Sequence, residues 1–177
     1  MAIKQGDVLG KLILDNEYEK IVEIGIWKSH TIQKILGSAA EKTIKEYWGV
    51  DWWLRPTDPI YGHYHTRTQE SWDRLHLKAC KLMRDFPQLR ILRTSSLEAV
   101  QIFPKRYFDL VFIDADHFYE SLKQDIKKWL PLVRKGGMIS GHDYGNKRFP
   151  GCTEAVDECF GKDNITLYDC HVWAKKI

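Results

Sequence analysis

The segment from Phe108 to Tyr144 constrains the fold of this chain most, because it contains a buried strand, an amphipathic helix and a second strand in succession. The nearly continuous apolar run Phe108–Ile113 is typical of a strand that helices cover on both faces. Apolar residues then recur at spacings of three and four, which predicts a helix with one buried face. They are Phe118, Leu122, Ile126, Trp129, Leu130 and Val133. We expect Gly136 and Gly137 to end this helix and turn the chain into the second strand, Met138–Gly141.

Polar residues follow both strands of this unit. Asp114 and His117 come after the first strand, and His142 and Asp143 come after the second. Ligands of open α/β sheets bind in the crevice beyond the carboxyl ends of the strands. The sequence therefore predicts that these four side chains line one site.

Size and charge restrict the classes of function. The 177 residues suffice for one domain, which we expect to span residues 1–177. The 27 basic and 24 acidic residues leave a formal net charge of +3, and the basic residues form no compact run, so nucleic acid is not an expected partner. No apolar stretch approaches the roughly 20 residues of a membrane span, and the first residues lack the order of a signal peptide. We therefore expect a cytoplasmic protein that does not bind membranes.

The cysteines argue against a structural zinc site, because none of them forms a CxxC pair. They are Cys80, Cys152, Cys159 and Cys170. Cys152 and Cys159 lie on one predicted helix, about 10 Å apart along its axis, which is too far for a disulfide. We expect free, mostly buried thiols.

A strand and a glycine turn precede the first long helix. The apolar residues of Ile21–Ile24 predict a central strand, and Gly25 allows a tight turn whose backbone can approach a ligand closely. Ser29 can cap the following helix, whose amino terminus offers unpaired N–H groups to an anion. Dinucleotide sites usually carry three glycines here and this turn keeps one, so a purely structural turn is an equally good interpretation.

A second acidic residue ends the next predicted strand. We expect that strand to run from Thr43 to Val50 and to end at Asp51, which lies 28 residues after Glu23. This spacing is about one βαβ repeat, the place where a carboxylate can accept two hydrogen bonds from ribose hydroxyls. The alternative is an ordinary turn or cap residue.

The segment from Trp52 to Tyr64 is aromatic and shows little periodicity. A loop of this length is usually functional or mobile, so we interpret it as a lid or substrate wall; the alternative is a loop folded over the core. We interpret His63 and His65 as a solvated pair rather than as a metal clamp. Thr66 and Gln69 resemble a capping box that opens an amphipathic helix.

The remaining elements follow from the same criteria. They are a helix at 7–18, a strand at 89–92, a polar turn and short helix at 94–100, a helix introduced by Pro150 and Gly151, and two closing strands at 165–168 and 171–174 that can pair antiparallel. The chain is thus predicted to be an α/β protein with helices on both faces of a mostly parallel sheet.

The order of motifs resembles the class I S-adenosylmethionine-dependent methyltransferases over nearly the whole chain. Within them it is most similar to the small-molecule O-methyltransferases that act on macrolide sugars and related natural products. The runs that carry the resemblance are VEIGIWKSHT, YWGVDWW, LRTSSLEAV, FDLVFIDADHFYESLKQDI, LVRKGGMISGHDY and PGCTEAVDECF. The resemblance implies a Rossmann-like three-layer sandwich whose seven-stranded, mostly parallel sheet has the order 3-2-1-4-5-7-6.

The resemblance also implies a set of residues that bind S-adenosylmethionine. Glu23, Gly25 and Ser29 would hold its methionine part, Asp51 its ribose, and Ser96 with Leu97 its adenine. The full implied set also includes Ile26, Trp52, Asp114 and Ala115.

Catalytic and metal-binding roles follow from the same resemblance. Asp114, His142 and Asp143 would bind Mg²⁺ or another divalent cation, although the imidazole of His142 favours an ion softer than magnesium. His117, together with Asp114, would be catalytic, with His117 as the general base that accepts the proton of a hydroxyl acceptor. The alternatives are a helix-capping role for His117 and a turn role for Asp143.

We therefore predict a methyltransferase that acts on an oxygen of a sugar or another small hydroxylated molecule. The sequence does not determine the acceptor or the need for a metal. It also leaves the oligomeric state open, and a homo-oligomer is one option. A non-catalytic module that binds the cofactor or a protein partner is the main alternative. An NAD-binding or nucleotide-sugar-binding oxidoreductase is disfavoured by the single-glycine turn.

Overall fold

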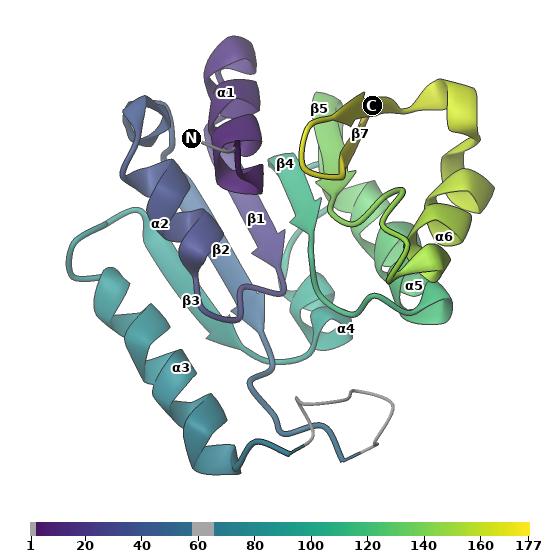
Figure 1. The fold of residues 1–177 in the computed structure, drawn as a ribbon. Coiled ribbons are helices and arrows are strands. Elements are labelled where there is room, and N and C mark those ends of the chain that lie inside the picture. Colours follow the sequence, from purple (N-terminus) through teal and green to yellow (C-terminus); the bar gives the residue numbers. More distant parts are fainter. Residues whose placement is uncertain (1–2, 58–65) are drawn as a thin grey trace.

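The structure, a computed structural model, describes residues 3–57 and 66–177. These residues form a seven-stranded sheet of order β3-β2-β1-β4-β5-β7-β6, which confirms the predicted order and the Rossmann-like architecture (Figure 1). The strands β1 to β5 are parallel, and β7 runs antiparallel to both β5 and β6. His63 and His65, which we interpreted as a solvated pair, and most of the predicted aromatic loop lie outside the described residues.

Most predicted elements are present, with bounds shifted by a few residues. The strands are β1 (Lys20–Ile24), β2 (Glu46–Asp51), β3 (Leu89–Arg93), β4 (Phe108–Ile113), β5 (Val133–Gly141), β6 (Thr166–Tyr168) and β7 (Val172–Lys176). The helices are α1 (Gln5–Asn16), α2 (His30–Leu36), α3 (Gln69–Leu82), α4 (Ser96–Ala99), α5 (Tyr119–Trp129) and α6 (Pro150–Phe160). Within residues 3–57 and 66–177, none of these helices has the length and apolar character needed to span a membrane.

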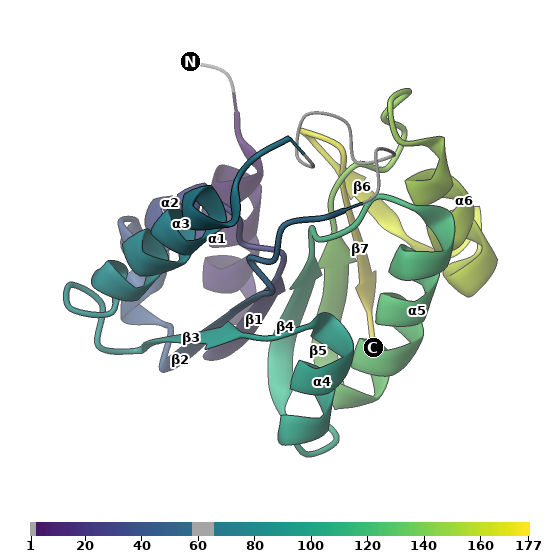
Figure 2. The ribbon, with the colours of Figure 1, turned by 90° about the horizontal axis from the view of Figure 1, so that it is seen from below.

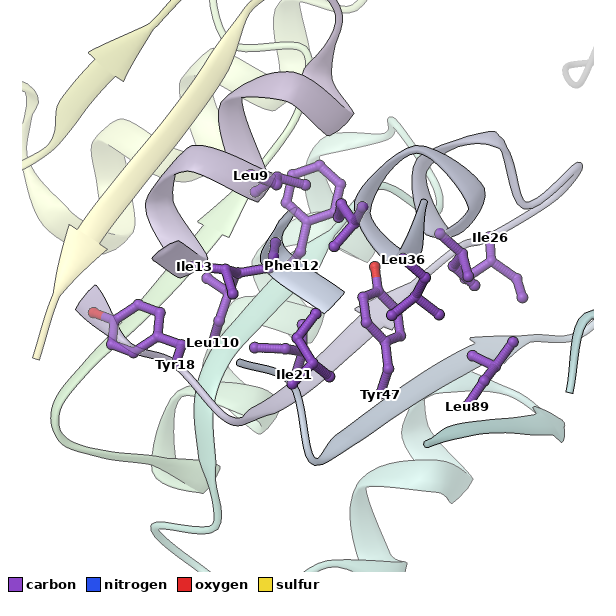
Figure 3. Close-up of a cluster of buried hydrophobic side chains, with 14 of the residues drawn as sticks. Leu9, Ile13, Tyr18, Ile21, Ile26, Leu36, Tyr47, Leu89, Leu110 and Phe112 are labelled. Atoms are coloured by element: carbon purple, nitrogen blue, oxygen red, sulfur yellow. The ribbon is translucent and has the colours of Figure 1, made fainter. Parts of the chain in front are cut away.

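Helices cover both faces of the sheet (Figure 2), and a hydrophobic core lies on each face. On one face, α1, α2 and α3 pack against side chains such as Ile21 and Leu110, and Figure 3 shows part of this core. On the other face, α4, α5 and α6 pack against Val22 and Val111. Successive strand residues point to opposite faces, so the apolar residues of β1 and β4 supply both cores.

The strand registers align the carboxyl ends of the central strands. Ile24 of β1 pairs with Val50 of β2 and with Ile113 of β4, and Ile113 pairs with Gly141 of β5. The residues at or just beyond these ends are Gly25, Asp51, Asp114 and His142. They therefore meet at one edge of the sheet, where the sequence placed the site.

The role predicted for Gly136 and Gly137 is wrong. Both lie inside β5, which begins at Val133, so Val133 does not belong to the helix either. Gly136 has φ +79° and Gly137 lies so close to the neighbouring strand that a Cβ on it would come within 2.7 Å of the Asp109 carbonyl oxygen. The glycines thus accommodate an irregularity in the β4–β5 register and do not form a turn.

Other boundaries also differ. The predicted strand Thr43–Val50 begins only at Glu46, because a 3₁₀ turn at Ala39–Lys42 precedes it. The predicted capping box at Thr66 is wrong, since the N-cap of α3 is Thr68. The cysteines are free thiols, but the prediction that most of them are buried is wrong, since only Cys152 is buried and the other three are partly exposed.

Candidate active site

The side chains after β4 and β5 converge. His117 Nε2 lies 2.8 Å from Asp143 Oδ2 and 3.4 Å from Asp114 Oδ1. His142 Nδ1 lies 3.0 Å from the same Asp143 oxygen and 3.7 Å from Asp114 Oδ1. Asp143 is buried and the other three are partly exposed. The four residues predicted to line one site therefore form one group, which we call the acid–histidine cluster.

Ion pairing controls protonation within the acid–histidine cluster. Burial alone would lower the pKa of His117, but hydrogen bonds to Asp114 and Asp143 outweigh it and raise that pKa to about 9. Burial likewise opposes ionisation of Asp143, yet His117 and His142 hold its pKa well below the usual range. In the protein alone at neutral pH, an Asp143 carboxylate thus faces a His117 imidazolium.

The segment that leads into α6 supports this cluster. The ring of Phe149 stacks on the ring of His117, with centroids 4.4 Å apart and planes 23° apart. Asn146 Nδ2 donates a hydrogen bond to Asp143 Oδ1. The helix-capping interpretation of His117 receives no support, because the N-cap of α5 is Phe118 and the His117 ring faces the carboxylates.

The glycine turn after β1 crosses the end of β4. Gly25 has φ +86°, and a Cβ on it would lie 2.3 Å from the carbonyl oxygen of Asp114 and 2.4 Å from the Cα of Ala115. Only glycine fits this conformation and this contact. This close contact joins two parts of the protein, and the approach of the turn to a ligand stays a prediction.

The rest of this turn leaves a buried hydroxyl without a partner. Ser29 occupies the N-cap position of α2 with φ 59°, but its side chain makes no cap hydrogen bond, so the predicted cap is wrong. The residue is 2% exposed, and its Oγ has no hydrogen-bond partner in the described part of the chain. Because an unpaired buried hydroxyl costs free energy, a hydrogen bond to a ligand at this Oγ would stabilise the site.

Glu23 is a buried carboxyl beneath the same turn. It is 1% exposed and accepts a 2.6 Å hydrogen bond from the hydroxyl of Tyr47. Burial raises the pKa of Glu23 to about 8, with hydrogen bonds from Tyr47 and Thr31 opposing the shift. The residue is therefore mostly neutral at pH 7, and it can ionise when a cation binds nearby.

Asp51 is tied to the backbone of the protein. Its carboxylate accepts 2.8 Å hydrogen bonds from the N–H groups of Trp27 and Trp53. Burial raises its pKa, while these hydrogen bonds lower it. The carboxylate thus joins the glycine turn to the end of β2, which agrees with the alternative of a turn residue and leaves fewer lone pairs for a ribose.

The other predicted cofactor residues divide into buried and exposed groups. Ile26 is 4% exposed and belongs to the core. Ser96 donates its hydroxyl to Asp125 and accepts a hydrogen bond from Trp129 Nε1 at 2.9 Å, so only its backbone is available to an adenine. Two of the predicted residues, Trp52 and Leu97, are exposed apolar side chains, at 57% and 36%.

Sequence reasoning missed several residues that contact the predicted ones. Among them are Gln5, Asp125, Asn146 and Phe149. Asp125 had a detectable signal, because it lies three residues after Leu122 and four before Trp129 and is thus a carboxylate on an apolar helix face. Gln5 had none, since its contact with Asp114 joins residues 109 positions apart.

The comparison with protein families decides the identity. A family model described as a methyltransferase domain matches residues 22–144, which is more than half of the chain and includes both the glycine turn and the acid–histidine cluster. The chain belongs to this methyltransferase family. It is a class I S-adenosylmethionine-dependent methyltransferase, as the resemblance implied. No curated protein matches the chain.

Solved structures of methyltransferases share the fold. The O-methyltransferase NovP superposes with a TM-score of 0.63 at 20% identity, over 94% of this chain and 75% of NovP. CalS11, a TDP-rhamnose 3'-O-methyltransferase of calicheamicin biosynthesis, gives 0.64 at 15% identity, over 98% of this chain and 80% of CalS11. The SAH-bound methyltransferase PaMTH1 from Podospora anserina gives 0.65 at 13% identity, over 99% of this chain and 79% of PaMTH1.

The acid–histidine cluster also offers a donor set for a cation. One ligand atom from each of Asp114, His117 and Asp143 lies within 4.8 Å of the others. The predicted set contained His142 instead of His117, and His142 is close to both carboxylates as well. The residues are therefore compatible with a bound divalent ion, which would have to replace the contacts between imidazoles and carboxylates.

Proposed function

We propose that this methyltransferase transfers the methyl group of S-adenosylmethionine to a hydroxyl oxygen of a sugar or another small molecule. The observation that carries the proposal is the position of His117, a base between two carboxylates, at the sheet edge that also holds the glycine turn. Methyl transfer is a displacement at a sulfonium-activated carbon, so alignment of donor and acceptor supplies much of the rate. A hydroxyl must also lose its proton, which calls for a nearby base.

In this proposal the glycine turn holds the methionine part of the cofactor. The unpaired Oγ of Ser29 is the proposed donor to the cofactor carboxylate, because the N–H groups of Gly25, Trp27 and Ser29 already have partners within the protein. Glu23 faces the cofactor ammonium group, and Trp52 with Leu97 covers its nucleoside. Ala115, beside the turn, lines the space between cofactor and acceptor.

His117 is the proposed general base, with Asp114 and Asp143 as the groups that orient it. To accept a proton the imidazole must first become neutral. The positive sulfonium of the cofactor lowers the pKa of a neighbouring imidazole, so cofactor binding works in the required direction. Phe149 holds the ring in its present plane.

A divalent cation is the second element of the proposal. Asp114, Asp143 and an imidazole of His142 or His117 would hold it, and these oxygen and nitrogen donors suit Mn²⁺ or Zn²⁺ better than Mg²⁺. When bound, such an ion makes a coordinated hydroxyl more acidic. Activity that survives exhaustive chelation would remove the ion from the proposal and leave His117 as the sole base.

The first test is calorimetric titration with S-adenosylmethionine, S-adenosylhomocysteine and NAD. We expect heat from the first two compounds and none from NAD. A non-catalytic module would bind the cofactor and show no turnover with any hydroxylated acceptor. Absence of heat with both sulfur compounds would refute the proposed function.

The second test is the substitution His117→Ala. We expect turnover to fall by about a hundredfold or more, the scale of a lost general base, while the affinity for S-adenosylhomocysteine changes little. His171→Ala is the matched control, because His171 lies in the β6–β7 turn, outside the acid–histidine cluster, and its ring nitrogen lies 3.0 Å from the Tyr144 carbonyl oxygen. Equal turnover in both variants would assign His117 a structural role.

A further inference from the structure

The first turn of α1 reaches the carboxyl edge of the sheet. Gln5, its first residue, donates one hydrogen bond from Nε2 to Asp114 Oδ2 and another to Thr31 Oγ1, both at 2.8 Å. A carboxylate only accepts hydrogen bonds, so the NH₂ end of the amide must face Asp114. Both hydrogens of this NH₂ group are then in use.

These bonds connect α2 to the acid–histidine cluster. Thr31 lies in the first turn of α2, so Gln5 links this helix to the Asp114 carboxylate. Thr31 also lowers the pKa of the buried Glu23 carboxyl, against the effect of burial.

The bond from Gln5 also fixes how Asp114 presents its carboxylate. With Oδ2 occupied, Oδ1 is the oxygen that faces His117 at 3.4 Å and His142 at 3.7 Å. Rotation of the carboxylate would break the Gln5 bond. Hydrogen bonds to charged groups are among the stronger ones in proteins, so this bond can select one orientation.

The backbone of Gln5 is held by contacts between α1 and α2. Gly6 lies so close to Lys34 that a Cβ on it would come within 2.8 Å of the Lys34 side chain. Asp7 forms a 2.9 Å ion pair with Lys34 and accepts a 3.1 Å hydrogen bond from the Lys4 N–H. The close packing against α2 and the Lys4–Asp7 hydrogen bond therefore hold the Gln5 side chain in position in the absence of a ligand.

We propose that Gln5 is a positioning residue for methyl transfer, which fixes the Asp114 carboxylate and ties it to α2 through Thr31. This inference rests on the proposed function of the acid–histidine cluster. Gln5 itself takes no proton and forms no bond to the reacting atoms. It acts by keeping Asp114 Oδ1 directed at the imidazoles.

The experiment compares the wild type with Gln5→Ala, Gln5→Glu and Gln124→Ala. Gln5→Glu keeps the size of the side chain but removes the donor when ionised. Gln124, exposed on α5, provides the matched control for replacing a helical glutamine with alanine. Thermal unfolding first establishes that each variant is folded.

Two readouts are measured on each folded variant. The first is the ¹⁵N chemical shifts of the His117 and His142 rings in the ligand-free protein at one fixed pH. The second is turnover, with the KM of the acceptor and the calorimetric affinity for S-adenosylhomocysteine. We expect both Gln5 variants to shift the ring signals and to lose about tenfold or more in kcat with little change in KM, the scale of a lost hydrogen bond to a charged group.

Two results would overturn the proposal. One is unchanged ring signals in the Gln5 variants, and the other is changed signals with a kcat equal to that of Gln124→Ala. Failure of the proposed function is a separate result, because a wild type that binds no S-adenosylhomocysteine shows it in calorimetry alone. A shift of the ring signals with lower turnover in both Gln5 variants, and not in Gln124→Ala, supports the positioning role.

Discussion

At the scale of single residues, the site is built from carboxyl groups whose environments differ sharply. Glu23 is buried beside a phenol and a hydroxyl, and its pKa is raised to about 8. Asp143 is equally hidden but faces two imidazoles, which hold its pKa far lower. Burial favours the neutral acid, and a nearby cation reverses that preference. One edge of the sheet thus holds a neutral carboxyl under the glycine turn and an anionic one in the acid–histidine cluster.

The neutral state of Glu23 leads to a prediction about proton release. If the cofactor ammonium group binds beside it, the pKa of Glu23 falls and the carboxyl ionises. At pH 7 we expect S-adenosylhomocysteine binding to release up to about one proton. Calorimetry in buffers with different ionisation enthalpies measures this number. The release should decline as the pH rises above 8 and should be absent in Glu23→Gln; equal release in that variant would contradict the role.

At the scale of elements, α5 connects the acid–histidine cluster to the turn after β3. Its amino terminus follows His117. About two turns later, the Asp125 carboxylate accepts a hydrogen bond from the hydroxyl of Ser96. Asp125 is 6% exposed. Burial raises its pKa to about 6, the bond from Ser96 opposes the shift, and the negative charge of Asp116 adds to it. Asp125 is therefore charged at neutral pH, and because it is buried, this charge lowers the stability of the fold.

The cost of Asp125 predicts a dependence of stability on pH. Its folded pKa exceeds the ordinary value of 3.8, so the charged form destabilises the fold above about pH 6 and the penalty disappears as the pH falls toward 4. The full shift corresponds to about 3 kcal/mol. Relative to the wild type, Asp125→Asn should thus be more stable at pH 7 than at pH 4 by up to about this amount. Urea unfolding at both values measures the difference, and a pH-independent difference would contradict it.

The elements also show where the sequence was informative. The strands Lys20–Ile24 and Phe108–Ile113 were predictable, because continuous apolar runs occur where helices cover both faces of a sheet. The glycines at 136 and 137 were not, since a glycine pair fits a turn and a strand irregularity equally well. The choice depends on the pairing with the neighbouring strands, which a local pattern does not contain.

At the scale of the whole molecule, the sheet edge gathers residues from five strand ends and from α1. The positions of Asp114 and Asp143 could be predicted, because the topology alone brings strand ends together. The orientations of side chains could not. The Ser96 hydroxyl donates to Asp125 of α5, and the Asp51 carboxylate accepts from backbone N–H groups. Gln5, which contacts Asp114, lies on a helix that is distant in sequence. Each of these depends on packing between elements that are remote in sequence.

Because the proposed cofactor site joins both halves of the sheet, its occupation should stabilise the whole fold. A ligand at 100 times its Kd stabilises the native state by about 2.7 kcal/mol, and for a domain of this size that is roughly 5–10 °C in Tm. We expect this shift with S-adenosylhomocysteine in differential scanning calorimetry, and no shift with NAD at the same concentration. The shift should persist in His117→Ala, whose lost group serves the acceptor, and should shrink in Glu23→Gln. A loss of the shift in His117→Ala would instead place His117 among the groups that bind the cofactor.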